Sequence, residues 1–216
     1  MQFDVILSSL PFLLEGVLVT LKFTLLSLAC GLPLGVGVAF CKIGKNCILK
    51  SLAEAYTSVF RGTPLLVQLS IIFFGLPTLT GYNMSPFVAG VLTFSLNSAA
   101  YISENIRSGL VSVDKGQWEA AELLGLSHKQ AFRHIILPQA FRTTLPSLVN
   151  EWINLLKESA IVSIIGEADL FRRAQVIAAE KYLYFEPYVT VALCYFILVM
   201  ILTFLAKRLE NRLAYA

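Results

Sequence analysis

The chain contains, at residues 119–138, the stretch EAAELLGLSHKQAFRHIILP. This stretch is charged and rich in helix-forming residues, and the sequence around it is almost continuously hydrophobic. A polar helical segment between membrane spans lies in water on one side of the bilayer, because charged side chains are costly in the hydrocarbon core. We therefore expect residues 119–138 to form an exposed surface that contacts another molecule.

The composition of the whole chain is typical of an integral membrane protein. Hydrophobic residues make up 56% of the 216 residues, charged residues make up 14%, and the mean hydropathy is +0.72. A soluble domain of this length contains about a quarter charged residues. The basic residues form no extended cluster, which excludes a nucleic-acid-binding protein, and the four cysteines lack metal-ligand spacing. We expect one membrane domain over residues 1–216, with no catalytic residues and no metal.

The hydrophobic segments predict an all-α integral membrane protein with five membrane-spanning helices. Residues 63–103 contain no charged residue and are too long for one crossing of a hydrocarbon core about 30 Å thick. Turn-forming residues near the middle of this run divide it into two spans, at Pro77, Gly81, Asn83 and Pro86. The five predicted spans cover approximately residues 16–40, 63–76, 86–106, 145–165 and 187–206.

The distribution of Lys and Arg predicts how the chain lies in the membrane. Basic residues are concentrated in the loop after the first predicted span, in the loop after the third and in the C-terminal tail: Lys42, Lys45, Lys50, Arg61, Lys115, Lys129, Arg133, Lys207, Arg208 and Arg212. The turn between the second and third predicted spans is uncharged, and the segment between the fourth and fifth contains both signs. An excess of Lys and Arg marks the cytoplasmic side. We therefore expect the N-terminus outside, and the C-terminus and the polar loop in the cytoplasm.

The polar loop predicts a helix-turn-helix along the membrane surface. Asp114 and Gln117 have the spacing of a capping box, in which the Asp114 side chain accepts free amides of the first turn. The first helix is expected over about residues 115–124. Gly125 suits the left-handed conformation that ends a helix.

Ser127, with Gln130 three residues later, predicts the start of a second helix. This helix is expected to end near Leu137, because Pro138 lacks a backbone N–H and marks entry to the next segment. The two alanines at 120 and 121 remove side-chain bulk, so a partner can approach the backbone closely. One apolar face of the first helix is predicted to contain Trp118, Ala121 and Leu124.

The sequence around this loop resembles a known family of membrane proteins. Glu119-Ala120-Ala121-x-x-x-Gly125, followed by Ile135-x-Leu137-Pro138, is similar to the signature loop of permease subunits of ATP-binding-cassette (ABC) importers. Two further motifs resemble the polar amino-acid uptake branch of that family: Arg61-Gly62-Thr63-Pro64 and Tyr101-x-x-Glu104-x-x-Arg107-x-Gly109. The resemblance covers residues 61–166, about half of the chain.

The resemblance implies a mechanical role in amino-acid import. In this family the loop docks on a separate ATPase subunit and transmits its closure to the spans, so the coupling positions here would be Gly116, Glu119, Ala120, Ala121, Gly125, Leu137 and Pro138. The chain lacks GxxxxGK[ST], so it would not be an enzyme, and ATP and Mg²⁺ would bind to the partner ATPase rather than to this chain. The other implied partners are a second permease copy or paralogue, an extracytoplasmic solute-binding protein and an amino-acid solute. The implied location is the bacterial inner membrane.

Two alternatives remain open at this point. From the residues alone, the loop can be a cytoplasmic connection that packs on the membrane surface and binds nothing. The chain can also be a membrane scaffold or regulatory subunit, whose loop docks an ATPase while the chain carries no solute.

The fourth predicted span contains a candidate solute pathway. A charge at the centre of a span costs about 2.5–3.5 kcal/mol on insertion scales and usually faces protein or water. Glu151, Asn154 and Glu158 are spaced at i, i+3 and i+7 and share one helical face, which can hold a cationic amino acid. The alternative is that Lys157 neutralises Glu158 or Glu151 and that the group only fixes helix packing.

Smaller expectations concern helix packing. Glu104 and Arg107 are three residues apart in the third predicted span and can pair, which favours a structural or gate-positioning role. The two histidines of the polar loop, His128 and His134, are expected to be exposed. Another helix can come close to the first span at its small residues, Gly31, Gly35 and Gly37.

Overall fold

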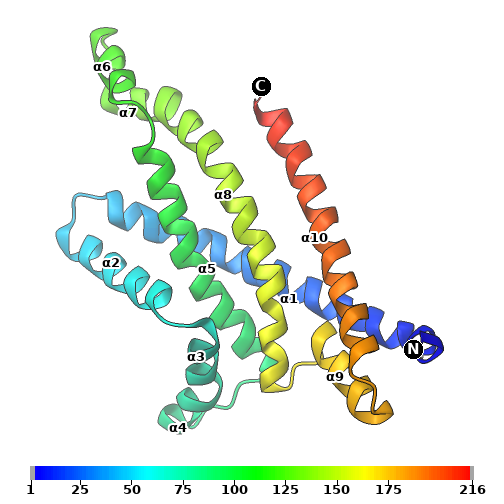
Figure 1. Ribbon diagram of the computed structural model, residues 1–216. Helices are drawn as coiled ribbons and strands as arrows, with labels where there is room; N and C mark the ends of the chain where they lie inside the picture. Colours follow the sequence, from blue (N-terminus) through cyan, green and yellow to red (C-terminus); the bar gives the residue numbers. More distant parts are fainter. Residues whose placement is uncertain (1–2, 215–216) are drawn as a thin grey trace.

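The computed structural model describes residues 3–214, with the side chains of residues 7–208 and 210, so the Arg212 side chain of the basic tail lies outside the described residues. Within this range every regular element is a helix, which confirms the predicted all-α class (Figure 1). The α-helices are α1 (Phe3–Ile43), α2 (Cys47–Gly62), α3 (Leu65–Ser70), α4 (Leu76–Thr80), α5 (Pro86–Val111), α6 (Lys115–Leu123), α7 (His128–Ala131), α8 (Leu137–Glu158), α9 (Leu170–Lys181) and α10 (Phe185–Ala214). Two π turns, η1 (Ile71–Gly75) and η2 (Phe132–Ile136), and a 3₁₀ helix, η3 (Ser159–Ile165), join consecutive helices.

The helices extend between two ends of an elongated molecule. α5, α8 and α10 run from one end to the other, and α1 crosses them at a steep angle (Figure 1). α6 and α7 project at one end, which is also the end where α10 finishes, and α3, α4 and α9 lie at the opposite end (Figure 1). The polar loop is therefore separated from the short helices at the other end by the length of α5 and α8.

Three helices in the described residues are long and apolar enough to cross a membrane, at Leu7–Ile43, Pro86–Val111 and Phe185–Arg208. A fourth span results if α2 and the segment Leu65–Thr80 are counted together, although they meet at an angle of 104°. α8 is not among these helices, because its charged and polar residues make it less apolar. The structure therefore supports apolar spans, and the count of five stays a prediction.

The bend between α2 and α3 has a physical cause at Pro64. A proline disfavours the helical conformation of the residue before it, and Thr63 is extended, with φ −121° and ψ 145°. The Gln68 side chain satisfies carbonyls at the end of α2, since Nε2 donates to Phe60 O at 2.8 Å and to Thr63 O at 3.0 Å. Asn97 of α5 donates to Gln68 Oε1 at 2.9 Å and fixes the bend against the bundle. A sharp bend between α2 and α3 therefore lies at the start of the predicted second span.

The predicted helix end before Pro138 is wrong. One helix continues from residue 128 to residue 158 and contains a single π turn, Phe132–Ile136. In this turn the Leu137 N–H donates to the Phe132 carbonyl, five residues earlier. Pro138 follows directly, in the first turn of α8, and the altered hydrogen-bond register upstream allows the helix to continue without the missing N–H.

Two clusters of buried apolar side chains hold the bundle together. The first joins α1, α3, α5, α8 and η3 through Phe23, Leu69, Phe94, Leu155, Val162 and Ile165. The second joins α1, α9 and α10 through Leu13, Leu170, Ala174, Ile177 and Val191. α1 contributes to both clusters, so it connects the two parts of the core.

α1 approaches α5 closely at Gly35. A Cβ added there would lie 2.7 Å from Ile102 Cγ2 and 3.0 Å from the Ala99 carbonyl oxygen, both too short for normal contact. Gly31 also faces α5, whereas nothing lies within 4 Å of a Cβ added at Gly37. Two of the three predicted small residues therefore serve packing inside this chain.

Candidate functional site

The α6–α7 loop, residues 114–138, begins with a side-chain cap. Asp114 Oδ1 accepts the Gly116 N–H at 2.6 Å, which confirms Asp114 as the cap of α6. Gln117 makes a different contact from the one predicted, because its Oε1 accepts a hydrogen bond from Gln139 Nε2 at 3.2 Å. The same Gln139 amide donates to the Ile135 carbonyl at 2.9 Å. These bonds tie the first turn of α6 to the first turn of α8.

The turn between α6 and α7 is a Schellman motif centred on Gly125. Gly125 has φ +73°, the left-handed region that glycine adopts without steric cost. Its N–H donates to the Glu122 carbonyl at 2.9 Å, and the Leu126 N–H donates to the Ala121 carbonyl at 3.1 Å. Both bonds satisfy carbonyls at the end of α6, so the predicted turn at Gly125 is confirmed.

The second helix of the loop starts at the predicted capping box. Ser127 Oγ accepts the Gln130 N–H at 3.4 Å, and Gln130 Oε1 accepts the Ser127 N–H at 3.0 Å. α7 itself has only four residues and leads through η2 into α8. The loop is therefore connected to α8 by continuous helix.

An aromatic stack that was not predicted from the sequence joins α6 to the following helix. The Trp118 ring stacks on His128, with centroids 4.5 Å apart and an interplanar angle of 19°. Phe132 extends the stack, with its ring centroid 6.5 Å from that of Trp118. His128 is exposed as predicted, but it also contributes packing. The sequence feature that could have indicated this stack is the presence of aromatic rings on both sides of the turn, at Trp118, His128 and Phe132.

The predicted apolar face of α6 is only partly correct. Ala121 is fully buried, so its small side chain serves packing inside the loop rather than access for a partner. Leu124 lies beyond the end of α6 and is 77% exposed, and Leu123 beside it is 90% exposed. Both leucines lie at the tip of the projecting loop.

The other six predicted coupling positions are exposed. Three belong to α6, one to its turn and two to the start of α8: Gly116, Glu119, Ala120, Gly125, Leu137 and Pro138. The hydrogen bond between Gln117 and Gln139 joins the two groups. The structure thus presents the signature residues on one projecting unit.

The predicted solute face lies on α8, away from the loop. Glu151 is half-buried, and Asn154 and Glu158 are exposed. Lys157 forms no ion pair within 4.0 Å with either carboxylate among the ion pairs of the described residues, although it acts on Glu158 electrostatically. Nowhere in the described part of the chain do three or more His, Cys, Asp or Glu side chains come together to hold a metal ion.

A cluster of charges, the Glu104 cluster, joins three helices in the bundle. Arg107 donates to Glu104 Oε2 through Nε at 3.1 Å and Nη2 at 2.9 Å, which confirms the predicted pair. Lys42 of α1 is a further member that was not predicted, and its ammonium group contacts Glu104 Oε1 and donates to Thr57 Oγ1 at 2.6 Å. Arg61 of α2 lies 3.7 Å from Glu104 Oε2. One carboxylate therefore connects α1, α2 and α5.

The sequence of this chain matches one family over most of its length. Residues 31–215 match the family described as "Binding-protein-dependent transport system inner membrane component". The chain belongs to this family. This inner membrane component is 53% identical to the putative glutamine transport system permease protein GlnP of Rickettsia typhi. The similarity extends over 202 residues, which are 94% of this chain and 93% of the relative. It is 47% identical to the arginine transport system permease protein ArtQ of Bacillus subtilis, over 99% of this chain and 97% of that protein.

Solved structures agree with this family. A crystal structure of an amino acid ABC transporter with histidines has a chain that is 43% identical, with a TM-score of 0.94, covering 98% of this inner membrane component and 99% of that chain. An inward-facing structure of the MetNI methionine ABC transporter has a TM-score of 0.74 at 22% identity, over 95% and 98% of the two chains, and shows the fold alone.

Proposed function

We propose that this chain is the permease subunit of an ABC importer that moves polar amino acids into the cytoplasm. The observation that carries the proposal is the match, over nearly the whole chain, to transport permeases named for glutamine and arginine. The neighbour with a TM-score of 0.94 is an amino acid ABC transporter. The scaffold alternative is not favoured, because these relatives are named as transport system permeases.

The proposed topology has five spans, with the N-terminus outside and the C-terminus in the cytoplasm of a bacterial inner membrane. The spans fall on α1, the segment from α3 to α4, α5, α8 and α10, and α2 belongs to the basic loop before the second span. The α6–α7 loop and the end of α10 lie at the same end of the molecule (Figure 1), and both carry basic residues, including Lys115, Lys129, Lys207 and Arg208. A Lys/Arg-rich end supports a cytoplasmic position for the loop.

The α6–α7 loop is the proposed docking element for a separate ATPase subunit, which would bind ATP and Mg²⁺. Glu119 is exposed on α6 and can pair with a basic side chain of the ATPase. The leucines at the tip, Leu123 and Leu124, would provide an apolar surface for contact with the ATPase. Because the Trp118 stack and the continuous helix from α7 into α8 hold the loop as one unit, ATP-driven closure of the ATPases would rotate α8.

The proposed solute pathway follows the polar face of α8 at Glu151, Asn154 and Glu158. An anionic face suits a cationic side chain or the α-ammonium group that every free amino acid carries. A second permease copy or paralogue would complete the pathway, and a solute-binding protein would deliver the amino acid from outside. Alternating exposure of this face to the two sides would give import.

The experiment is ATP-driven uptake into liposomes that contain this chain with its ATPase and solute-binding protein. Radiolabelled arginine, lysine, histidine, glutamine and glutamate are compared at equal concentration. We expect uptake of at least one polar amino acid that requires both ATP and the binding protein. A complex that assembles and hydrolyses ATP but takes up none of them would support the scaffold alternative.

A further inference from the structure

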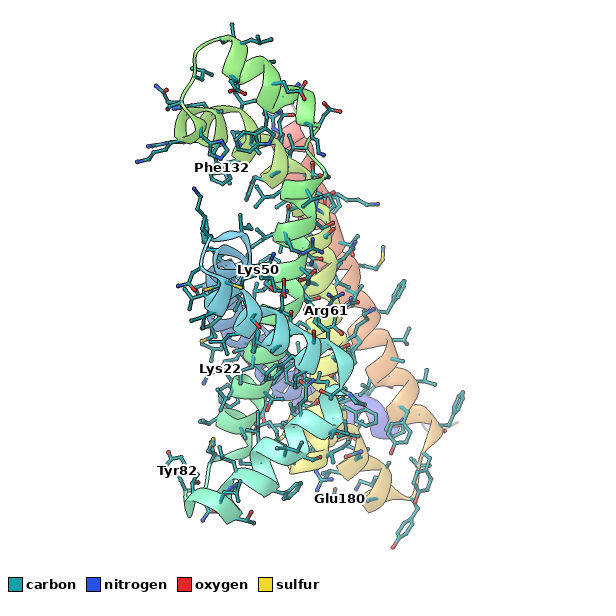
Figure 2. All side chains as sticks on the ribbon, turned by 90° about the vertical axis from the view of Figure 1, so that its left-hand side faces the viewer. Lys22, Lys50, Arg61, Tyr82, Phe132 and Glu180 are labelled. Atoms are coloured by element: carbon teal, nitrogen blue, oxygen red, sulfur yellow. The ribbon has the colours of Figure 1, made fainter. Side chains whose placement is uncertain are left out.

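A polar pocket of about 570 Å³ lies between the end of α1, α2 and the second half of α5. Figure 2 shows Lys50 and Arg61 on this side of the molecule, between the α6–α7 loop, marked by Phe132, and the opposite end, marked by Tyr82. The charged groups that line the pocket are Lys42, Lys50, Arg61, Arg107, Glu54 and Glu104. The acidic residues of α8 are not among the residues that line the pocket.

The pocket contains more positive than negative charge. Its four cationic side chains outnumber its two carboxylates, which leaves two positive charges in excess. Glu54 lies 4.0 Å from Lys50, and Glu104 forms ion pairs with each of the other three cations. Sharing one carboxylate leaves the cations incompletely neutralised, and an anion in the pocket would lower their mutual repulsion.

Three of the four cations are held in place, and the two arginines among them still have hydrogen-bond donors available. The Lys42 side chain is only 4% exposed, whereas Arg61 and Arg107 are 45% and 46% exposed and reach into the pocket. The Arg61 guanidinium stacks on the Tyr101 ring, 5.3 Å from its centroid, which fixes its plane. A guanidinium has five N–H donors, and the two bonds from Arg107 to Glu104 occupy only some of them. Such forks match the oxygens of a phosphate group.

The rim of the pocket is apolar. Ile43 and Val111 line it and are 48% and 71% exposed. A ligand with a charged head and hydrocarbon chains can satisfy both parts of this surface, whereas a free phosphate ion would leave the rim in contact with water.

We propose that this pocket binds the phosphate headgroup of an anionic phospholipid from the cytoplasmic leaflet. The proposal rests on the proposed function only for the orientation of the chain in the membrane. Basic pockets between helices on the cytoplasmic side are general sites for anionic headgroups. The bound lipid would bridge α1, α2 and α5 at the charges that Glu104 leaves unneutralised.

The test measures lipid binding to the full chain in complex with its ATPase, in detergent, by titration with phosphatidylglycerol and detection by native mass spectrometry. Phosphatidylcholine, which has no net charge, is titrated in parallel. The pocket variant combines Lys50→Gln with Arg107→Gln and leaves the buried pair of Lys42 and Glu104 intact. The matched control combines Lys45→Gln with Lys115→Gln, two exposed lysines that do not line the pocket.

We expect saturable binding of phosphatidylglycerol that is stronger than binding of phosphatidylcholine. Each removed charge should weaken it about fivefold, so the pocket variant should bind about 25-fold more weakly and the control should match the wild type. Equal affinity for the two lipids, or an equal loss in both variants, would overturn the proposal.

Competition identifies the source of the anion. Millimolar inorganic phosphate or arginine that displaces phosphatidylglycerol from the wild type would assign the pocket to a soluble anion or to the solute, and would overturn the lipid proposal. The assay needs no transport, so a failure of the proposed function, seen as absent uptake, is distinguishable from a failure of lipid binding. A circular dichroism spectrum like that of the wild type shows that the pocket variant is folded.

Discussion

The α6–α7 loop and the Glu104 cluster are both polar, but different kinds of contact hold them. The caps and the turn of the loop use bonds between near neighbours, of which the longest joins residues 121 and 126. In the Glu104 cluster, Lys42 and Glu104 are 62 residues apart in the sequence. A local polar structure can fail without affecting the rest of the chain, whereas the loss of a long-range one affects the packing of several helices.

The largest effect on stability is expected from Glu104→Gln. This change removes the carboxylate that serves the buried Lys42, and breaking a buried ion pair costs about 3–5 kcal/mol. The free energy of unfolding, measured by denaturant titration in detergent, should fall by about that amount. Glu54→Gln is the matched control, because its side chain is 58% exposed and its pair with Lys50 should contribute less than about 1 kcal/mol. Equal losses in the two variants would remove the distinction between buried and exposed pairs.

Gly125→Asp should uncouple the loop while leaving the bundle folded. A side chain at φ +73° is strained by roughly 1–2 kcal/mol, and the new charge lies at the proposed ATPase contact. Co-purification of the ATPase and uptake should both fall at least about tenfold, the factor that 1.4 kcal/mol gives. Gly81→Asp is the control, since Gly81 has φ +72° and an equally open position in the turn between α4 and α5. The docking assignment fails if the two variants retain the ATPase equally.

Gly35→Ala should destabilise the contact between α1 and α5. The added Cβ would lie 2.7 Å from Ile102 Cγ2, and overpacking of this kind costs about 1–3 kcal/mol. Gly37→Ala, two residues along the same helix, adds its methyl group into open space and should not lower the stability. Thermal unfolding followed by circular dichroism compares them, and a similar loss in both would show that α1 packs differently.

Glu158→Gln should reduce the uptake of arginine more than that of glutamine. Loss of one favourable charge contact, worth about 1.4 kcal/mol, corresponds to about a tenfold lower rate of arginine uptake. Initial uptake rates in liposomes measure this, with Glu180→Gln on the exposed surface of α9 as the control. If arginine and glutamine are affected equally or not at all in both Glu158→Gln and Glu151→Gln, these carboxylates do not select the solute.

The smallest effect is expected from Ser127→Ala, which removes a cap. Loss of an N-cap costs about 1 kcal/mol, and here it should be confined to the loop. Hydrogen exchange of the amides in residues 128–131 should become faster, while the amides of α5 remain unchanged. Ser85→Ala, which removes the corresponding cap of α5, should show the reverse pattern. Faster exchange throughout the bundle in Ser127→Ala would mean that the loop is not an independent local structure.

The sequence was sufficient for the features that depend on neighbouring residues. Asp114, Gly125 and Ser127 each act within five residues of their own position, so their residue types alone predicted the caps and the turn. The pairing of Glu104 with Arg107 was also predicted, because three residues separate them on one helix. The resemblance of the loop to permease sequences added the proposed role, and the comparisons confirmed the family.

The features that the sequence did not predict depend on tertiary contacts or on hydrogen-bond register. Lys42 was interpreted only as a loop charge, because nothing in its neighbourhood indicates a partner 62 residues away. The helix continues through Pro138 because a π turn precedes it, and residue propensities do not distinguish this turn from a break. The 104° bend before α3 has a local cause in Pro64, but the hydrogen bonds of Gln68 and Asn97 that join it to α2 and α5 are tertiary contacts.

Coupling through the α6–α7 loop is best tested by solute-stimulated ATP hydrolysis of the complete complex, this chain with its ATPase and loaded binding protein, in liposomes. We predict that arginine or glutamine stimulates hydrolysis in the wild type and that Gly125→Asp abolishes the stimulation without lowering the hydrolysis of the ATPase alone. Stimulation of equal size in Gly125→Asp would contradict the claim that the α6–α7 loop couples the ATPase to the solute pathway.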